Sequence, residues 1–146
     1  MLIERDALVA LPSVVVGSTV TVAATGAGDG GTPAMATLQV TGRSVAPPPP
    51  VHLRSMVLDD GGARVTWIRR SRAGWAWPDG GDVPLAEERE RYRVTASNAA
   101  GVRAAIVETA VFDLSAAECA AGAVRVTVCQ IGTAAASADA SIIIGE

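Results

Sequence analysis

Apolar and polar residues alternate along much of the chain, which is the pattern of half-buried β-strands. The alternation is clearest in residues 63–69, 91–97 and 123–131, where arginine and threonine occupy most of the intervening positions. The side chains that it turns toward one face are Val65, Trp67, Tyr92, Val94, Ala96, Val124, Val126 and Val128. These three segments therefore predict three strands that share one core.

Further strand-like segments follow one another at short intervals. Residues 51–58, 102–108, 110–114 and 140–144 bring the total to about seven strands, with turn sequences such as DDGG at 59–62 between them. Residues 115–121 have helical propensity but are few, so we expect one helical turn that crosses between two sheets. Many short strands with frequent turns predict an all-β fold, arranged as a β-sandwich.

The first third of the chain predicts a separate β-hairpin. Two strand-like segments, residues 14–24 and 36–41, flank a glycine-rich turn at 25–33. Two strands alone bury too little apolar surface, so this piece needs a following domain or a neighbouring chain to pack on. Four prolines at 47–50 form a stiff polyproline II connector. We therefore divide the chain into a hairpin or partial domain, residues 1–46, and a sandwich, residues 47–146.

Composition narrows the classes of partner. Hydrophobic residues make up 49% and charged residues 18%, which is enough for a real core. The net charge is −3, with 12 basic against 15 acidic side chains, and this argues against nucleic acid as a partner. No apolar run approaches the ~18 residues of a membrane helix, so we expect no membrane insertion. Cys119 and Cys129 are expected as reduced thiols, with a disulfide between them as the alternative.

The residues that usually carry chemistry are sparse. His52 is the only histidine, which excludes a histidine-based zinc site, and we expect it at the rim of a strand. The carboxylates of Glu87, Glu88 and Glu90 alternate with arginines and are better explained as a solvated charge run than as a glycosidase pair. The glycine-rich residues 26–31 lack the lysine and hydroxyl residue of a phosphate loop. We therefore predict that the protein is not an enzyme and that it binds no metal ion and no cofactor.

The segment from 69 to 90 is long for a sandwich loop, and long loops often carry function. In one interpretation Trp75 and Trp77 stack on a sugar ring or enter a partner's pocket, while Arg70 and Arg72 hold acidic groups. In the other, which we favour for most of these residues, the loop folds back on its own domain. Its arginines then pair with its carboxylates, and its indoles cover the sheet edge; the carboxylates concerned are Asp79, Asp82, Glu87 and Glu88.

Four residues are assigned to the core of the sandwich: Trp67, Tyr92, Val94 and Val126. The indole of Trp67 stands at a core position of the alternating pattern and would bury on the order of 200 Å² between the sheets. The fold therefore depends on this side chain more than on any loop residue.

The proline run, Trp67 in the second strand and Tyr92 at the start of the third give residues 47–144 a resemblance to a fibronectin type III-like domain. Residues 50–54 (PVHLR), 66–72 (TWIRRSR), 83–94 (VPLAEERERYRV) and 124–131 (VRVTVCQI) carry a closer one. They resemble the C-terminal region of the tail-tip hub protein of siphophages and gene transfer agents, often called the host specificity protein. Residues 36–43 (ATLQVTGR) resemble the end of the domain that precedes this module there.

This resemblance implies a structural, non-enzymatic component of a tail tip or baseplate. Its partners would be other tail and baseplate proteins in a homo- or hetero-oligomeric assembly, with a host cell-surface glycan as a further candidate. The chain would be assembled in the bacterial host cytoplasm and reside in the virion, with a role in tail assembly and host attachment. Two alternatives stay open: a carbohydrate- or host-surface-binding module, and an accessory domain of an extracellular hydrolase.

Overall fold

A computed structural model describes residues 16–24, 30, 32–73 and 84–145 of the chain. The chain divides into two compact units, Met1–Gly42 and Arg43–Glu146. The four prolines of residues 47–50 fall in the second unit, where Pro47 and Pro50 are buried. Each unit is described separately below.

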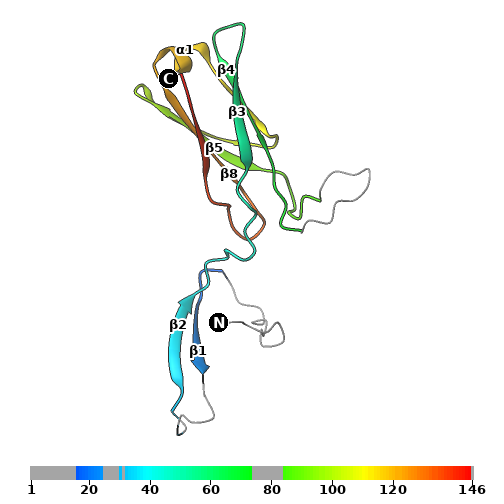
Figure 1. The fold of residues 1–146 in the computed structure, drawn as a ribbon, viewed down its shortest axis with the longest axis vertical. Helices are drawn as coiled ribbons and strands as arrows, with labels where there is room; N and C mark the ends of the chain where they lie inside the picture. Colours follow the sequence, from blue (N-terminus) through cyan, green and yellow to red (C-terminus); the bar gives the residue numbers. More distant parts are fainter. Residues whose placement is uncertain (1–15, 25–29, 31, 74–83, 146) are drawn as a thin grey trace. The chain divides into compact units, whose positions relative to one another are not determined.

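The first unit holds one antiparallel hairpin, made of β1 (Thr19–Ala24) and β2 (Ala34–Gln39). Figure 1 shows it as a two-stranded ribbon. The strand predicted from residue 14 begins only at Thr19, because Gly17 has a φ of 94°, a left-handed conformation that ends an extended strand. The second strand begins two residues earlier than expected, directly after Pro33.

The second unit is a sandwich of two antiparallel sheets. One sheet has the order β3-β4-β7 and the other the order β6-β5-β8-β9. The strands are β3 (Val51–Val57), β4 (Ala63–Ile68), β5 (Tyr92–Asn98), β6 (Gly101–Val107), β7 (Val111–Leu114), β8 (Val124–Gln130) and β9 (Ala140–Ile144). Figure 1 shows β3 and β4 as one layer in front of β5 and β8. The fourth strand of the sandwich, β6, pairs with the third, which is the fibronectin type III-like arrangement; the predicted all-β fold is confirmed.

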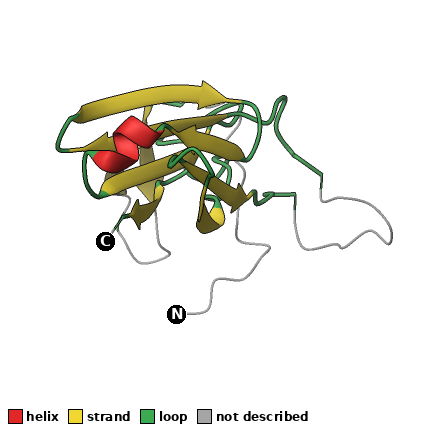
Figure 2. Cartoon of the chain, turned by 90° about the horizontal axis from the view of Figure 1, so that it is seen from above, coloured by secondary structure: helices red, strands yellow, loops and turns green. Residues whose placement is uncertain are grey.

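One short helix carries the chain from the three-stranded to the four-stranded sheet, as the sequence predicts. This helix, α1 (Ala116–Ala120), begins with a capping box in which the Ser115 hydroxyl accepts from the Glu118 N–H and the Glu118 carboxylate accepts from the Ser115 N–H. Figure 2 shows the helix at one end of the strands. The cap fixes the crossover without any buried helical side chain.

The core lies between the two sheets and is nearly all apolar. The side chains of Val65, Tyr92, Val94, Val126 and Val128 are fully buried. Trp67 is 4% exposed and meets Tyr92 edge to face, with ring centroids 5.1 Å apart and planes at 77°. Phe112 and Leu114 on β7 close the core from the three-stranded sheet. The alternation that predicted the strands is therefore also the alternation that fills the core.

Candidate functional site

The base of the long loop between β4 and β5 is held by a buried carboxylate. The Glu87 side chain is 1% exposed, and its Oε1 accepts a hydrogen bond of 2.7 Å from Arg72 Nε. Its Oε2 accepts one of 2.7 Å from the Thr133 N–H, on the loop between β8 and β9. The Thr133 hydroxyl in turn accepts from the Glu88 N–H at 3.2 Å. Two loops that are 46 residues apart in sequence are thus joined at one side chain.

The chain that enters the sandwich packs against the same place. A Cβ added to Gly132 would lie 2.5 Å from Pro47 Cδ, 2.7 Å from the Ala135 carbonyl oxygen and 3.0 Å from Glu87 Oε2. Only glycine leaves room for these three groups to converge. We call the five residues that meet here, Pro47, Arg72, Glu87, Gly132 and Thr133, the Glu87 cluster.

The electrostatics of the cluster favour the ionised carboxylate. Burial by itself raises the pKa of the Glu87 carboxyl, but the hydrogen bonds from Thr133 and from the Arg72 guanidinium outweigh it. The pKa of Glu87 therefore lies below its ordinary value of 4.5. A carboxylate held in this way accepts hydrogen bonds and is a poor proton donor, so its arrangement suits a structural clamp.

A second contact lies just inside the loop base. The Tyr92 hydroxyl donates to Glu90 Oε1 at 2.8 Å, and Glu90 Oε2 lies 3.9 Å from Arg69 Nε. Burial, and then the hydrogen bond to Glu90, raise the pKa of Tyr92 above its ordinary value of 10. Tyr92 thereby links the core to the loop, because its ring packs on Trp67 while its hydroxyl binds the charge run.

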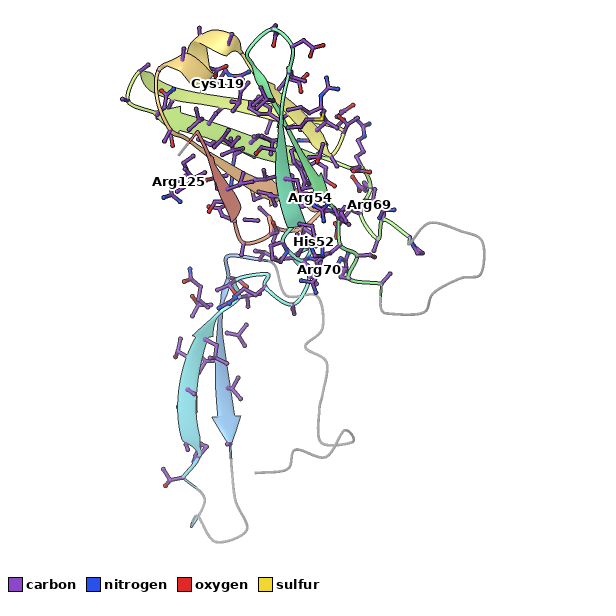
Figure 3. The ribbon with its side chains drawn as sticks, turned by 45° about the horizontal axis from the view of Figure 1, so that its top comes forward. His52, Arg54, Arg69, Arg70, Cys119 and Arg125 are labelled. Atoms are coloured by element: carbon purple, nitrogen blue, oxygen red, sulfur yellow. The ribbon has the colours of Figure 1, made fainter. Side chains whose placement is uncertain are left out.

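Of the four predicted contact residues, the structure describes two. Trp75 and Trp77 lie outside the described residues, as do Asp79 and Asp82. Arg72 is engaged with Glu87 and also donates to the Ala86 carbonyl oxygen at 3.0 Å. Arg70 is half-buried and makes no ion pair with a described residue. Figure 3 shows Arg70 with Arg69 and His52 at the end of the sandwich where the loop leaves β4.

The Arg72–Glu87 pair is one of the pairs that the folded-back interpretation expects, whereas the indoles of that interpretation lie outside the described residues. Sequence reasoning named Glu87 as one acceptor among several. It missed Thr133 and Gly132, which carry no charge and stand far away in the sequence. The signal that pointed to the clamp was the pairing of an arginine run with a glutamate run at the two ends of one loop.

Two surface hollows of the described residues differ in how their volumes compare with those of ordinary ligand pockets. One of about 180 Å³ lies beside the Glu87 cluster and is lined by Glu88, Arg89, Arg91, Ile131, Gly132 and Thr133. Another, of about 330 Å³, lies near α1, but Asn98 there donates to the Glu118 carbonyl oxygen and accepts from two backbone N–H groups. Ligand pockets are commonly about 300–1,000 Å³, so the hollow beside the Glu87 cluster is smaller than this range and the hollow near α1 lies at its lower end.

Several further features bear on chemistry. Within residues 16–24, 30, 32–73 and 84–145, no group of three or more histidine, cysteine, aspartate or glutamate side chains could hold a metal ion. In the same part of the chain, no helix is both long and apolar enough to cross a membrane.

Both thiols are free: Cys129 is buried and Cys119 is half-buried. His52 is exposed on a bulge of β3, with a φ of 52°.

Comparison with known proteins places the fold. No protein-family profile matches the chain, and no curated protein matches it. The chain resembles domains d3–d4 of the rat CD45 extracellular region at 8% identity, over 100% of this chain and 74% of that one, with a TM-score of 0.50. A structure described as a myokine matches at 16% identity over 68% and 97%, with a TM-score of 0.47. Titin domains A168–A170 match at 13% identity over 99% and 43%, with a TM-score of 0.43.

At 8% identity the match to the CD45 region speaks to the fold alone. The CD45 region is built of domains of the fibronectin type III and immunoglobulin-like kind, in agreement with the strand order described above. The chain has a fibronectin type III-like β-sandwich, preceded by a β-hairpin.

Proposed function

We propose that this chain is a structural, non-enzymatic component of the tail tip or baseplate of a phage or gene-transfer-agent-like particle, acting in tail assembly and host attachment. The proposal starts from the resemblance of residues 50–54, 66–72, 83–94 and 124–131 to the tail-tip hub protein. The sandwich supplies a unit with its own packed core, and the hairpin supplies exposed apolar side chains that a neighbour could cover.

The observation that carries the proposal is the hairpin. It forms a unit apart from the sandwich, and its strand residues are exposed apart from Val20, which is half-buried. Val22 is 40% exposed and Leu38 is 57% exposed. A two-stranded hairpin is at best marginally stable in water, and an assembly in which a neighbour covers the hairpin would supply the missing contacts.

The polar contacts of the sandwich support a structural role in the same way. Arg72, Arg64 and Arg103 are each paired with a carboxylate of the same unit, at 2.7 Å. Arg103 also lies over the Phe112 ring at 4.4 Å. These arginines form ion pairs that hold loops and strands of the same unit together. Internal pairing of this kind suits a structural module that keeps its neighbours in fixed positions.

Fractionation of particles from the strain that encodes the chain tests this proposal. A lysate is separated on a density gradient, and antibody against this chain is applied to each fraction, with a known soluble enzyme of the host as the control. We expect the chain to sediment with assembled tails and the control to remain at the top. A chain found only in the soluble fractions, with tails lacking it, would overturn the proposal.

A further inference from the structure

One face of the β1–β2 hairpin is wholly apolar. The register sets Val20 opposite Leu38, Val22 opposite Ala36 and Ala24 opposite Ala34. Successive residues of a strand point to opposite faces, so these three pairs share one face. The pairs on the other face are Thr19–Gln39, Thr21–Thr37 and Ala23–Met35. The hairpin is therefore amphipathic, and on its apolar face all residues are exposed except Val20, which is half-buried.

Both edges of the hairpin are also open. In the described structure β1 pairs with β2 alone, and β2 pairs with β1 alone. Natural edge strands are usually protected by charged side chains, prolines or bulges. Residues 16–42 contain a single ionisable side chain, Asp29, which lies outside both strands. A second hairpin of the same sequence would therefore meet no like charge along either strand.

The area of the apolar face limits the ways in which the hairpins of several copies of the chain could associate. Six residues at a rise of about 3.4 Å, on two strands about 4.8 Å apart, give a face of roughly 20 Å by 10 Å, or ~200 Å². A stable interface buries about 800 Å² from each partner. Two faces stacked on each other fall well short of that area. A ring of hairpins buries the two edges of each copy as well as its face, so each copy buries more surface in a ring than in a stacked pair.

We propose that the hairpins of three or more copies of this chain join edge to edge, with β2 of each copy beside β1 of the next, to close a small β-barrel. The strands then alternate in direction all around, because each hairpin contributes one strand of each direction. The apolar face points inward, where alanine at three of its six positions suits a narrow interior. Closure leaves no open edge, and the threonine-rich face meets water.

This inference rests on the proposed function only in placing the ring within a particle. The partner of each hairpin is the hairpin of another copy of the same chain. The test is the mass of the purified full-length protein, measured by size-exclusion chromatography with light scattering at micromolar concentration. We expect the wild type to contain at least three copies. Leu38→Glu puts a charge inside the barrel, and we expect it to give monomers.

Thr37→Glu is the matched control, since it adds the same charge at the next position of the same strand but on the other face. We expect it to keep the wild-type mass. The urea midpoint of each variant shows that the sandwich is intact and that only association has changed. Because the sandwich is a separate unit, we expect these midpoints to match that of the wild type.

Three results would overturn the ring. The first is a wild-type protein that is a monomer, since something other than a second copy would then cover the apolar face. The second is a wild-type dimer, and the third is an equal loss of association in Leu38→Glu and Thr37→Glu. The outcome is distinguishable from that of the particle experiment. If the protein is a monomer but still sediments with tails, the ring is wrong and the proposed function stands. If the protein forms a ring but is absent from tails, the ring stands and the proposed function is wrong.

Discussion

Trp67 is the residue on which the sandwich depends most. Its indole is 4% exposed and packs edge to face on Tyr92 between the two sheets. Removing it leaves a cavity that the surrounding strands fill only in part. At this scale the alternating pattern was sufficient to find the core, because a side chain at every second position of a strand faces the same way.

Trp67→Ala should lower the free energy of unfolding by roughly 3–5 kcal/mol. Urea denaturation followed by far-ultraviolet circular dichroism measures this change. Ile68→Ala is the control, since Ile68 is the next residue of β4 and is 58% exposed; its effect should stay within about 0.5 kcal/mol. Equal effects of the two substitutions would show that the indole is not the centre of the core.

Gln130 is the polar exception in the core. Its side chain is 0% exposed, and neither its Oε1 nor its Nε2 has a hydrogen-bond partner within the described residues. A buried amide without partners costs about 1–3 kcal/mol, so Gln130→Met, which keeps the length of the side chain, should stabilise the sandwich by about that amount. Urea midpoints measure the change, with Gln39→Met on the exposed hairpin as the control. A loss of stability on Gln130→Met would contradict this explanation.

Among the elements, the two described ends of the loop between β4 and β5 are held by contacts, of which only some involve residues of the loop itself. The arginines and glutamates at its two ends predicted internal pairing, and Arg72 and Glu87 form such a pair. The second half of the clamp is the Thr133 N–H, a backbone group available at almost any residue and hence invisible in a sequence pattern. The space at Gly132 is equally hidden, because only packing shows what a side chain would strike.

Gly132→Ala should destabilise the sandwich, because the new Cβ would lie 2.5 Å from Pro47 Cδ and 2.7 Å from the Ala135 carbonyl oxygen. Relieving these contacts requires shifts in the backbone, which typically cost about 1–3 kcal/mol. Thermal unfolding measures the effect, and Ala134→Ser, at an exposed position of the same loop, is the control. An unchanged melting temperature for Gly132→Ala would show that the three segments do not converge there.

The boundaries of the elements show where sequence patterns lose precision. Apolar alternation located the strands of the sandwich to within one or two residues, since burial on one face enforces the period. The first hairpin strand was expected to include residues 16–18, but Gly17 has a φ of 94° and the strand begins at Thr19, whereas residues 14 and 15 lie outside the described residues. The proline run was predicted as a stiff connector at the start of the sandwich, and Pro47 and Pro50 of this run are buried.

At the scale of the whole molecule, ionisation sets a window of pH in which the sandwich is most stable. Three carboxyl groups have pKa values below the ordinary range: Asp113 through its hydrogen bond from Arg64, Glu118 through the Ser115 N–H, and Glu87 through Thr133 and Arg72 despite its burial. Carboxyl groups of this kind stabilise the folded state above their ordinary pKa and lose that contribution as the pH falls.

Tyr92 acts in the opposite direction. Its pKa is raised, so its contribution to stability is complete below its ordinary value of 10 and is lost as the pH rises beyond it. We therefore expect a urea midpoint that is highest between about pH 5 and pH 9 and falls on both sides. Glu87→Gln should flatten the acid limb and Tyr92→Phe the alkaline limb. A midpoint that rises toward pH 3 would contradict these assignments.

The fold class followed from the sequence because it depends on periodicity, whereas the function depends on a surface and on what covers it. The proposed particle component is therefore tested most directly by locating the chain on intact particles. Gold-labelled antibody against this chain, imaged by electron microscopy, should mark the distal end of the tail and leave the head and tail shaft bare. Label on the head or shaft, or particles without label beside abundant free protein, would contradict the account.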